Sequence, residues 1–194
     1  VVVAVLDTGS TSHSDLNANT IAGYDMISDA TVGGDGNGRD SNPADPGDFY
    51  NGNPSSWHGT HVAGTVAAVT NNDVGVAGTA FDAQVSHVRV LGRGGGYTSD
   101  IADGIVWASG GSVPGVPANQ NPAEVINLSL GGSGACGNTT QNAINGAVSR
   151  GTTVAVAAGN SNANVSGFTP ANCANVIAVA ATDQNGSRAS FSNY

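Results

Sequence analysis

The chain opens with the seven residues VVVAVLD (residues 1–7), a run of apolar and mostly β-branched side chains that ends in an aspartate. Apolar and polar residues do not alternate in this run, which is typical of a strand buried on both faces, as in a parallel sheet. We expect the first strand at residues 1–6. Four further runs have the same character, and they occupy residues 85–91, 125–130, 153–158 and 176–181.

The segments between these runs carry small and apolar residues at helical spacing, and the expected helices are residues 59–69, 98–109 and 139–150. Thr98 and Ser99 are candidate N-caps, and Gly151 stands where a C-terminal cap belongs. Strands that alternate with helices predict right-handed βαβ units, and hence a three-layer α/β/α domain with a mostly parallel central sheet. The working site of such a sheet lies beyond the carboxyl ends of its strands.

Composition limits the function classes. The 194 residues suit one domain or a large part of one, and 39% of them are hydrophobic, which is enough for a sizeable core. The net charge is −9, with five Arg and no Lys, so the chain lacks the basic surface that nucleic acid requires. No apolar run approaches the ~20 residues of a membrane span. We expect a monomer that binds neither nucleic acid nor a membrane.

Residues 24–54 differ from the rest of the chain. They contain six Asp and three Pro and show no periodicity, so we expect one long insertion loop. Loops of this length are usually functional or ordered by a ligand. Alternating Asp, Asn and Gly suits Ca²⁺, although no bidentate Glu follows as in an EF-hand. A solvated acidic loop is the alternative to a calcium site, for which the candidate ligands are Asp35, Asp40, Asp45 and Asp48.

The two cysteines, Cys136 and Cys173, are separated by 37 residues and have no histidine near them, which does not fit a zinc site. They form either one disulfide in a secreted protein or two buried thiols in a cytosolic one. We expect the disulfide.

Three polar residues occupy places where chemistry can occur. Asp7 follows the first strand, His58 begins the segment HGTHVAGT (residues 58–65), and Asn160 ends AAGN (residues 157–160). Taken singly, Asp7 and Asn160 could simply cap turns. A metal pair of His58 with His61 lacks the i, i+4 spacing and the Glu of the HExxH motif. An Asp, a His at a helix start and an Asn at one rim together indicate acyl transfer.

The chain resembles the subtilisin-like serine proteases, or subtilases. The resemblance rests on VAVLDTG (residues 3–9), HGTHVAGT (58–65), VINLSLGG (125–132) and AAGN (157–160), in the family's order and spacing. It is closest to secreted bacterial members that carry an Asp/Gly/Asn-rich insertion before the histidine motif. It implies a secreted, extracellular serine endopeptidase acting on proteins or peptides.

The resemblance also implies roles for individual residues. Asp7 would orient and stabilise the imidazole of His58, which would act first as general base and then as general acid. Asn160 would donate a hydrogen bond to the oxyanion. Two chain segments would pair with an extended peptide by strand addition, and Tyr97 would wall a subsite. The expected substrate-binding residues are Gly94, Gly95, Gly96, Tyr97, Ser129, Leu130 and Gly131.

The family's nucleophile motif, Gly-Thr-Ser-Met-Ala, does not occur in the chain, and Ser187, Ser190 and Ser192 are not in that context. We therefore expect a partial catalytic domain, incomplete at both ends and inactive alone. The serine would lie beyond residue 194, and an N-terminal pro-segment would belong to the parent protein. The alternative is a non-catalytic, calcium-stabilised binding module. A cofactor-binding α/β enzyme would need a glycine fingerprint after the first strand, which Gly9 alone does not provide.

The segment TNNDVGV (residues 70–76) resembles the subtilase loop that binds a structural Ca²⁺. That match implies the Asn72 side chain and the carbonyl groups of Thr70, Val74 and Val76 as ligands, with Asp15 as the charged partner. An ordinary Asn-rich turn is the alternative.

Overall fold

The computed structural model describes residues 1–194 and contains a six-stranded parallel sheet, an antiparallel strand pair and four α-helices. The strands are β1 (Val2–Asp7), β2 (Thr20–Asp25), β3 (Gln84–Arg89), β4 (Val125–Leu128), β5 (Gly132–Ser133), β6 (Thr153–Ala157), β7 (Phe168–Thr169) and β8 (Ile177–Val179). The helices are α1 (Ala30–Gly33), α2 (His58–Ala67), α3 (Thr98–Ala108) and α4 (Asn138–Ser149), with short 3₁₀ helices at Asn17–Asn19 and Val165–Gly167.

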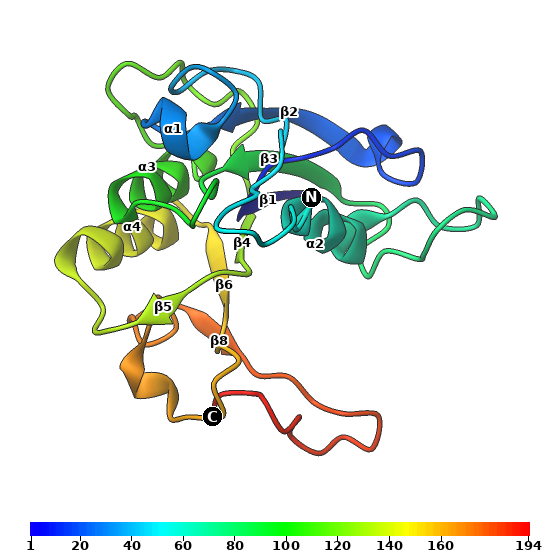
Figure 1. Ribbon diagram of the computed structural model, residues 1–194, viewed down its shortest axis with the longest axis vertical. Coiled ribbons are helices and arrows are strands. Elements are labelled where there is room, and N and C mark those ends of the chain that lie inside the picture. The colour runs from blue at the N-terminus through cyan, green and yellow to red at the C-terminus, as the bar shows by residue number, and fades with distance from the viewer.

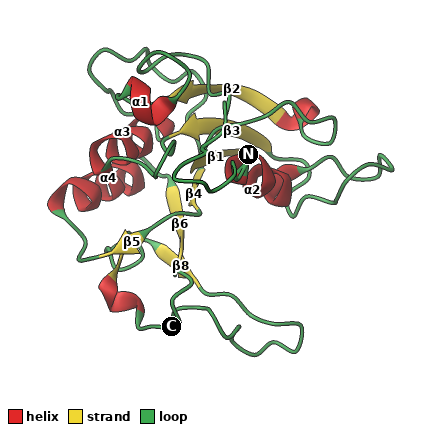
Figure 2. Ribbon diagram, viewed as in Figure 1, coloured by secondary structure: helices red, strands yellow, loops and turns green.

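The main sheet has the order β2-β3-β1-β4-β6-β8, and β5 pairs with β7. Helices α3 and α4 lie side by side on one face of the sheet, and α2 lies on the other (Figures 1 and 2). Successive residues of β1 enter separate cores, because Leu6 packs in the α3/α4 layer and Val5 packs beneath α2. Burial on both faces explains the unbroken apolar run, and the predicted three-layer α/β/α architecture is confirmed. No helix has the length and apolar character that crossing a membrane would demand.

All five expected strands and all three expected helices are present, with ends shifted by up to two residues. The prediction of one long loop over residues 24–54 is wrong in part, because β2 reaches into it and α1 lies within it. Strand β2 passes so close to β3 that a Cβ on Gly23 would lie 1.9 Å from the His87 carbonyl oxygen. Helix α1 is a single turn, capped by the Asp29 side chain, which accepts the N–H groups of Thr31 and Val32. Neither β2 nor α1 has apolar residues at a regular spacing in the sequence, so neither element was predicted.

The two expected helix caps have different outcomes. Tyr97 is the N-cap of α3 and no side chain caps the helix, so the prediction of Thr98 or Ser99 at this position is wrong. Gly151 follows α4 with φ 95° and donates its N–H to the Val148 carbonyl at 3.0 Å, as expected of a C-terminal cap.

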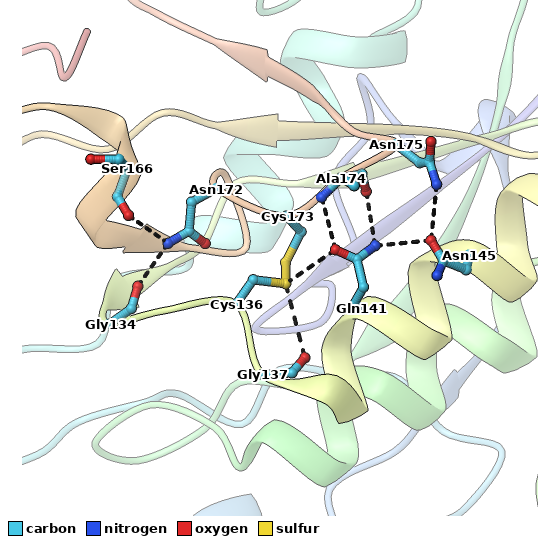
Figure 3. The surroundings of a disulfide bond; sticks show 10 residues. All are labelled: Gly134, Cys136, Gly137, Gln141, Asn145, Ser166, Asn172, Cys173, Ala174 and Asn175. Carbon is cyan, nitrogen blue, oxygen red and sulfur yellow. Dashed lines mark hydrogen bonds between the residues drawn. A yellow bond between two sulfur atoms is a disulfide. The ribbon is translucent and has the colours of Figure 1, made fainter.

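The expected disulfide is present between Cys136 and Cys173, whose Cα atoms are 5.2 Å apart (Figure 3). It joins the segment before α4 to the segment between β7 and β8. Gln141 supports the same junction, because its amide oxygen accepts the Ala174 N–H at 2.8 Å and its amide nitrogen donates to the Ala174 carbonyl at 3.0 Å. The covalent link and these hydrogen bonds hold the two segments together.

His87 is buried in the middle of β3, and neither of its ring nitrogens has a hydrogen-bond partner. Burial lowers the pKa of His87 from the ordinary 6.5 to about 4, and the nearby Asp7 charge opposes this shift. The folded protein therefore keeps the ring neutral at pH values where the unfolded chain binds a proton.

We predict that the free energy of unfolding falls as the pH drops from 6.5 toward 4. Below the unfolded pKa only the unfolded chain binds the extra proton, so this one residue costs the folded state up to about 3 kcal/mol at pH 4. Denaturant unfolding of a His87→Leu variant should depend less on pH across this interval. An identical pH dependence in the variant and the wild type would contradict this assignment.

Candidate active site

Asp7 is the last residue of β1 and is fully buried between β3 and β4. Its backbone carbonyl accepts the N–H groups of Val90 and Leu91 at 2.9 and 3.1 Å. Its carboxylate accepts the N–H of Thr8 at 2.8 Å. A carboxylate at the carboxyl end of a doubly buried strand is thus held in one position by backbone hydrogen bonds.

His58 is the first residue of α2, and it directly follows Trp57, whose backbone adopts the left-handed conformation with φ 53°. The Nδ1 atom of His58 lies 2.7 and 2.8 Å from the two carboxylate oxygens of Asp7. The predicted contact between Asp7 and His58 is confirmed. Because a carboxylate only accepts hydrogen bonds, Nδ1 carries the proton, and Nε2 is left to accept one.

The end of β1 and the start of α2 are joined directly. The hydroxyl oxygen of Thr8 accepts the N–H of Gly59 at 3.0 Å. A side chain at Gly59 could not be accommodated, because its Cβ would lie 2.4 Å from the Gly9 carbonyl oxygen. The glycine that follows His58 therefore allows the helix to approach the strand closely enough for the Asp7 contact.

The surroundings of His58 favour its charged form. The hydrogen bond with Asp7 raises the pKa of His58, burial opposes this, and the negative charges of Asp7 and then Asp48 add to the rise. A buried carboxylate that stabilises an imidazolium is what a general base requires, because the base becomes positively charged when it removes a proton.

Arg89, at the end of β3, is almost completely buried and fixes the same corner of the sheet. Its Nε donates to the Thr8 carbonyl at 3.2 Å, and its Nη1 donates to Asp25 at 2.5 Å and Asp35 at 3.1 Å. Its Nη2 donates to the carbonyl of Gly33. One guanidinium thus ties together the carboxyl ends of β1 and β2 and the segment that follows α1.

A groove of about 840 Å³ runs along the exposed side of His58. The sequence-predicted cleft residues that line it with His58 are Gly94, Gly95, Gly96, Ser129, Leu130 and Gly131. The two predicted edges therefore lie on one groove, as a strand-like peptide would require.

Two predicted residues lie beside the groove. Tyr97 lines a separate pocket with Arg93 that shares residues 94–96 with the groove. Asn160 is exposed beyond β6 in an adjoining cavity of about 350 Å³, which shares residues 129–133 with the groove. The role of Asn160 as an oxyanion donor stays a prediction.

Sequence reasoning missed one wall of the groove, which is formed by Asp48, Tyr50 and Ser56. The dipeptide Asn51-Gly52 was the available signal, because it is typical of a tight hairpin turn.

Asp15 and the segment 70–76 lie together as predicted. The Asp15 carboxylate is buried and accepts the Asn72 side-chain N–H at 2.7 Å and the Val76 backbone N–H at 2.9 Å, and these hydrogen bonds lower its pKa. The Thr70 hydroxyl is buried without a partner. The atoms predicted to ligate a metal here are all oxygens, which suits Ca²⁺.

The second set of predicted calcium ligands does not converge. Asp35 binds Arg89, and Asp48 binds Ser56. Asp40 accepts from Asn37 and Asn42, and Asp45 accepts the N–H of Gly47. No three His, Cys, Asp or Glu side chains form a group that could hold a metal ion. These residues do not fit one calcium site, because each carboxylate is bound to a different partner.

The chain supplies no serine hydroxyl to the His58 ring, whose hydrogen-bond partner is Asp7. The Ser192 hydroxyl is buried, and it bonds instead to the Asn193 carbonyl and the Ala181 N–H. The site thus holds the carboxylate of Asp7 and the imidazole of His58, but residues 1–194 supply no nucleophile to Nε2 of His58.

Comparisons with known proteins agree with this geometry. The sequence profile of the Subtilase family matches residues 1–194. The chain is 71% identical to an extracellular protease of Xanthomonas campestris and 52% identical to an extracellular basic protease of Dichelobacter nodosus, over its full length in both. It covers 35% and 34% of those two proteins, so it spans about a third of their length.

A solved protease structure from Pseudoalteromonas arctica is similar over the whole chain, with a TM-score of 0.97 and 64% identity. The chain covers 60% of that structure.

Proposed function

Since the chain belongs to the subtilase family, we propose that it forms the part of a serine endopeptidase that carries the acid and the base of the catalytic triad. The observation that carries the proposal is the pair of contacts, at 2.7 and 2.8 Å, between Nδ1 of His58 and the buried carboxylate of Asp7. The serine would come from a segment outside residues 1–194.

In this reaction Nε2 of His58 takes the proton of the serine hydroxyl as its oxygen attacks the carbonyl carbon of the peptide bond. The Asp7 carboxylate stabilises the imidazolium that forms. His58 then gives the proton to the leaving amine, and an acyl-enzyme remains. Water, deprotonated in turn by His58, hydrolyses this ester and releases the second product. Asn160 would donate a hydrogen bond to the oxyanion in both steps.

The lining of the groove supports the proposal that the substrate is a peptide. Residues 94–96 and 129–131 line the groove on which His58 lies, and they would pair with the backbone of an extended chain. Backbone pairing does not depend on side chains, so proteins of many sequences could bind.

We also propose that the protein is secreted. A structural disulfide persists in an oxidising compartment, and Cys136 and Cys173 are joined. The names of the two relatives above describe extracellular proteases.

The activity is tested with the full-length protein that contains this chain. We expect it to hydrolyse casein and a chromogenic peptide amide, and to be inactivated by serine-directed phosphonyl or sulfonyl reagents. A His58→Ala variant should lose about 10⁶-fold in kcat, because the serine has no base. Residues 1–194 expressed alone should show no turnover above their own His58→Ala control.

Two results would contradict the proposal. Turnover by residues 1–194 above that control would place a nucleophile within the chain. If the folded full-length protein binds peptides but cleaves none of them, the result would instead favour a non-catalytic binding module.

We further propose that Asp15 and the 70–76 segment bind a structural Ca²⁺. Its ligands would be Asp15, the Asn72 amide oxygen and the carbonyl groups of Thr70, Val74 and Val76. Five such oxygens fall short of the six to eight that Ca²⁺ takes, so water would complete the shell. The metal would hold the segment against Asp15, in the turn before the 3₁₀ helix Asn17–Asn19, and supply no chemistry to the reaction.

Chelation should therefore lower the Tm of the protein, and added Ca²⁺ should restore it. In an Asp15→Asn variant the Tm should no longer respond to Ca²⁺, whereas Asp82→Asn, which removes an exposed carboxylate elsewhere, should respond as the wild type does. Equal responses of Asp15→Asn and the wild type would exclude this site.

A further inference from the structure

Residues 48–56 form a small hairpin beside His58, referred to here as the 48–56 hairpin. At its tip Asn53 donates its N–H to the Tyr50 carbonyl at 2.9 Å, and Tyr50 donates back at 3.3 Å. The two central residues, Asn51 and Gly52, have φ values of 48° and 82°, as a tight hairpin turn requires. The turn therefore fixes the backbone position from which the Tyr50 side chain extends.

The base of the hairpin is closed by a side chain. The Asp48 carboxylate accepts the Ser56 N–H at 2.5 Å through one oxygen and the Ser56 hydroxyl at 2.8 Å through the other. The hydroxyl of Ser56 also accepts the N–H of His58 at 3.3 Å. The 48–56 hairpin is thus hydrogen-bonded to the first residue of α2.

The hairpin walls the groove on the side of the 94–96 edge. Asp48 and Tyr50 line the same groove as His58. The Tyr50 ring packs against Gly94, where a Cβ would lie 3.3 Å from the ring carbon Cε1. Tyr50 is half exposed and lines both the groove that contains His58 and the neighbouring pocket that contains Arg93, so a substrate side chain between His58 and the 94–96 edge can reach it from the groove.

The charge in this wall has one sign. Asp48 is the single carboxylate that lines the groove, and none of the five arginines does so. Asp48 has no ion-pair partner, although it lies close enough to His58 to influence it electrostatically. Each of its oxygens accepts one hydrogen bond from Ser56, which leaves each with a free lone pair.

We infer that the 48–56 hairpin selects substrates, with the Tyr50 ring and the Asp48 carboxylate together binding a lysine or arginine side chain of the substrate residue that lies between His58 and the 94–96 edge. This rests on the protease activity proposed above. The methylene groups of such a side chain cover the Tyr50 ring, and its cation lies over the ring face and near the carboxylate. A neutral side chain keeps the ring contact alone, and an acidic one is repelled.

A purely positioning role for Asp48 would give different kinetic results. If Asp48 acted only through Ser56 and the charge of His58, its loss would change the cleavage of every substrate by the same factor. It would also move the acidic limb of the pH profile to lower pH, because the Asp48 charge raises the pKa of His58. Selectivity between two substrates would not change.

The test uses the full-length protein and a positional library of chromogenic peptide amides, with each residue before the cleaved bond varied in turn. We expect lysine and arginine to be favoured over norleucine at a single position by about fivefold in kcat/KM at low salt, with the preference shrinking as salt is added. Asp48→Asn should cause the largest loss of the preference, Tyr50→Ala should cause a smaller loss, and Tyr50→Phe should keep the preference. The control Asp82→Asn removes an equal charge outside the groove and should leave the preference unchanged.

An unchanged preference in Asp48→Asn, with cleavage retained, would overturn this inference and leave the protease activity standing. Should the wild type cleave no peptide, the protease activity fails, and the binding of uncleaved lysine and norleucine peptides then tests the hairpin directly. Tighter binding of the lysine peptide, weakened in Asp48→Asn, would support the inference, and equal binding of the two peptides would overturn it. Thermal unfolding of each variant checks that the substitution has not disrupted the fold.

Discussion

The hydrogen bond from the Gly59 N–H to the Thr8 hydroxyl, 3.0 Å long, joins the end of β1 to the start of α2. Asp7 immediately precedes this contact on the strand, and His58 immediately precedes it on the helix. The separation between acid and base is therefore set by one backbone-to-side-chain bond and by the absence of a side chain at Gly59. A shift of about 1 Å at such a junction can cost about 10²-fold in rate.

The strand side of the junction is rigid because β1 is paired on both edges and buried on both faces. Asp7 stands in register with Arg89 of β3, and the Asp7 carbonyl is held by the backbone beyond that residue. The Arg89 guanidinium then connects Thr8 to Asp25 and to the loop after α1. A buried cation is stable only when its hydrogen bonds are satisfied, so this network fixes the geometry of the corner.

The parts predicted from sequence are those whose signal lies in consecutive residues. The unbroken apolar runs gave the strands buried on both faces, and the polar residue after the first run gave Asp7. By contrast, β2 is specified by the close approach of Gly23 to the His87 carbonyl, which no local pattern reveals. The acidic residues before His58 looked like one cation site, but Asp40, Asp45 and Asp48 accept hydrogen bonds from their own local turns and Asp35 binds Arg89. Tyr50 reaches the groove only because the 48–56 hairpin folds back over Gly94.

The central claim is that Asp7 holds His58 in the tautomer whose Nε2 can accept a proton, and nitrogen NMR of histidine-labelled residues 1–194 measures this directly. Above the pKa of His58, the account predicts a protonated Nδ1 and an unprotonated Nε2. In an Asp7→Asn variant the pKa of His58 should fall, because the largest stabilisation of the imidazolium is the Asp7 hydrogen bond. A proton on Nε2 in the wild type, or an unchanged pKa in the variant, would contradict the account.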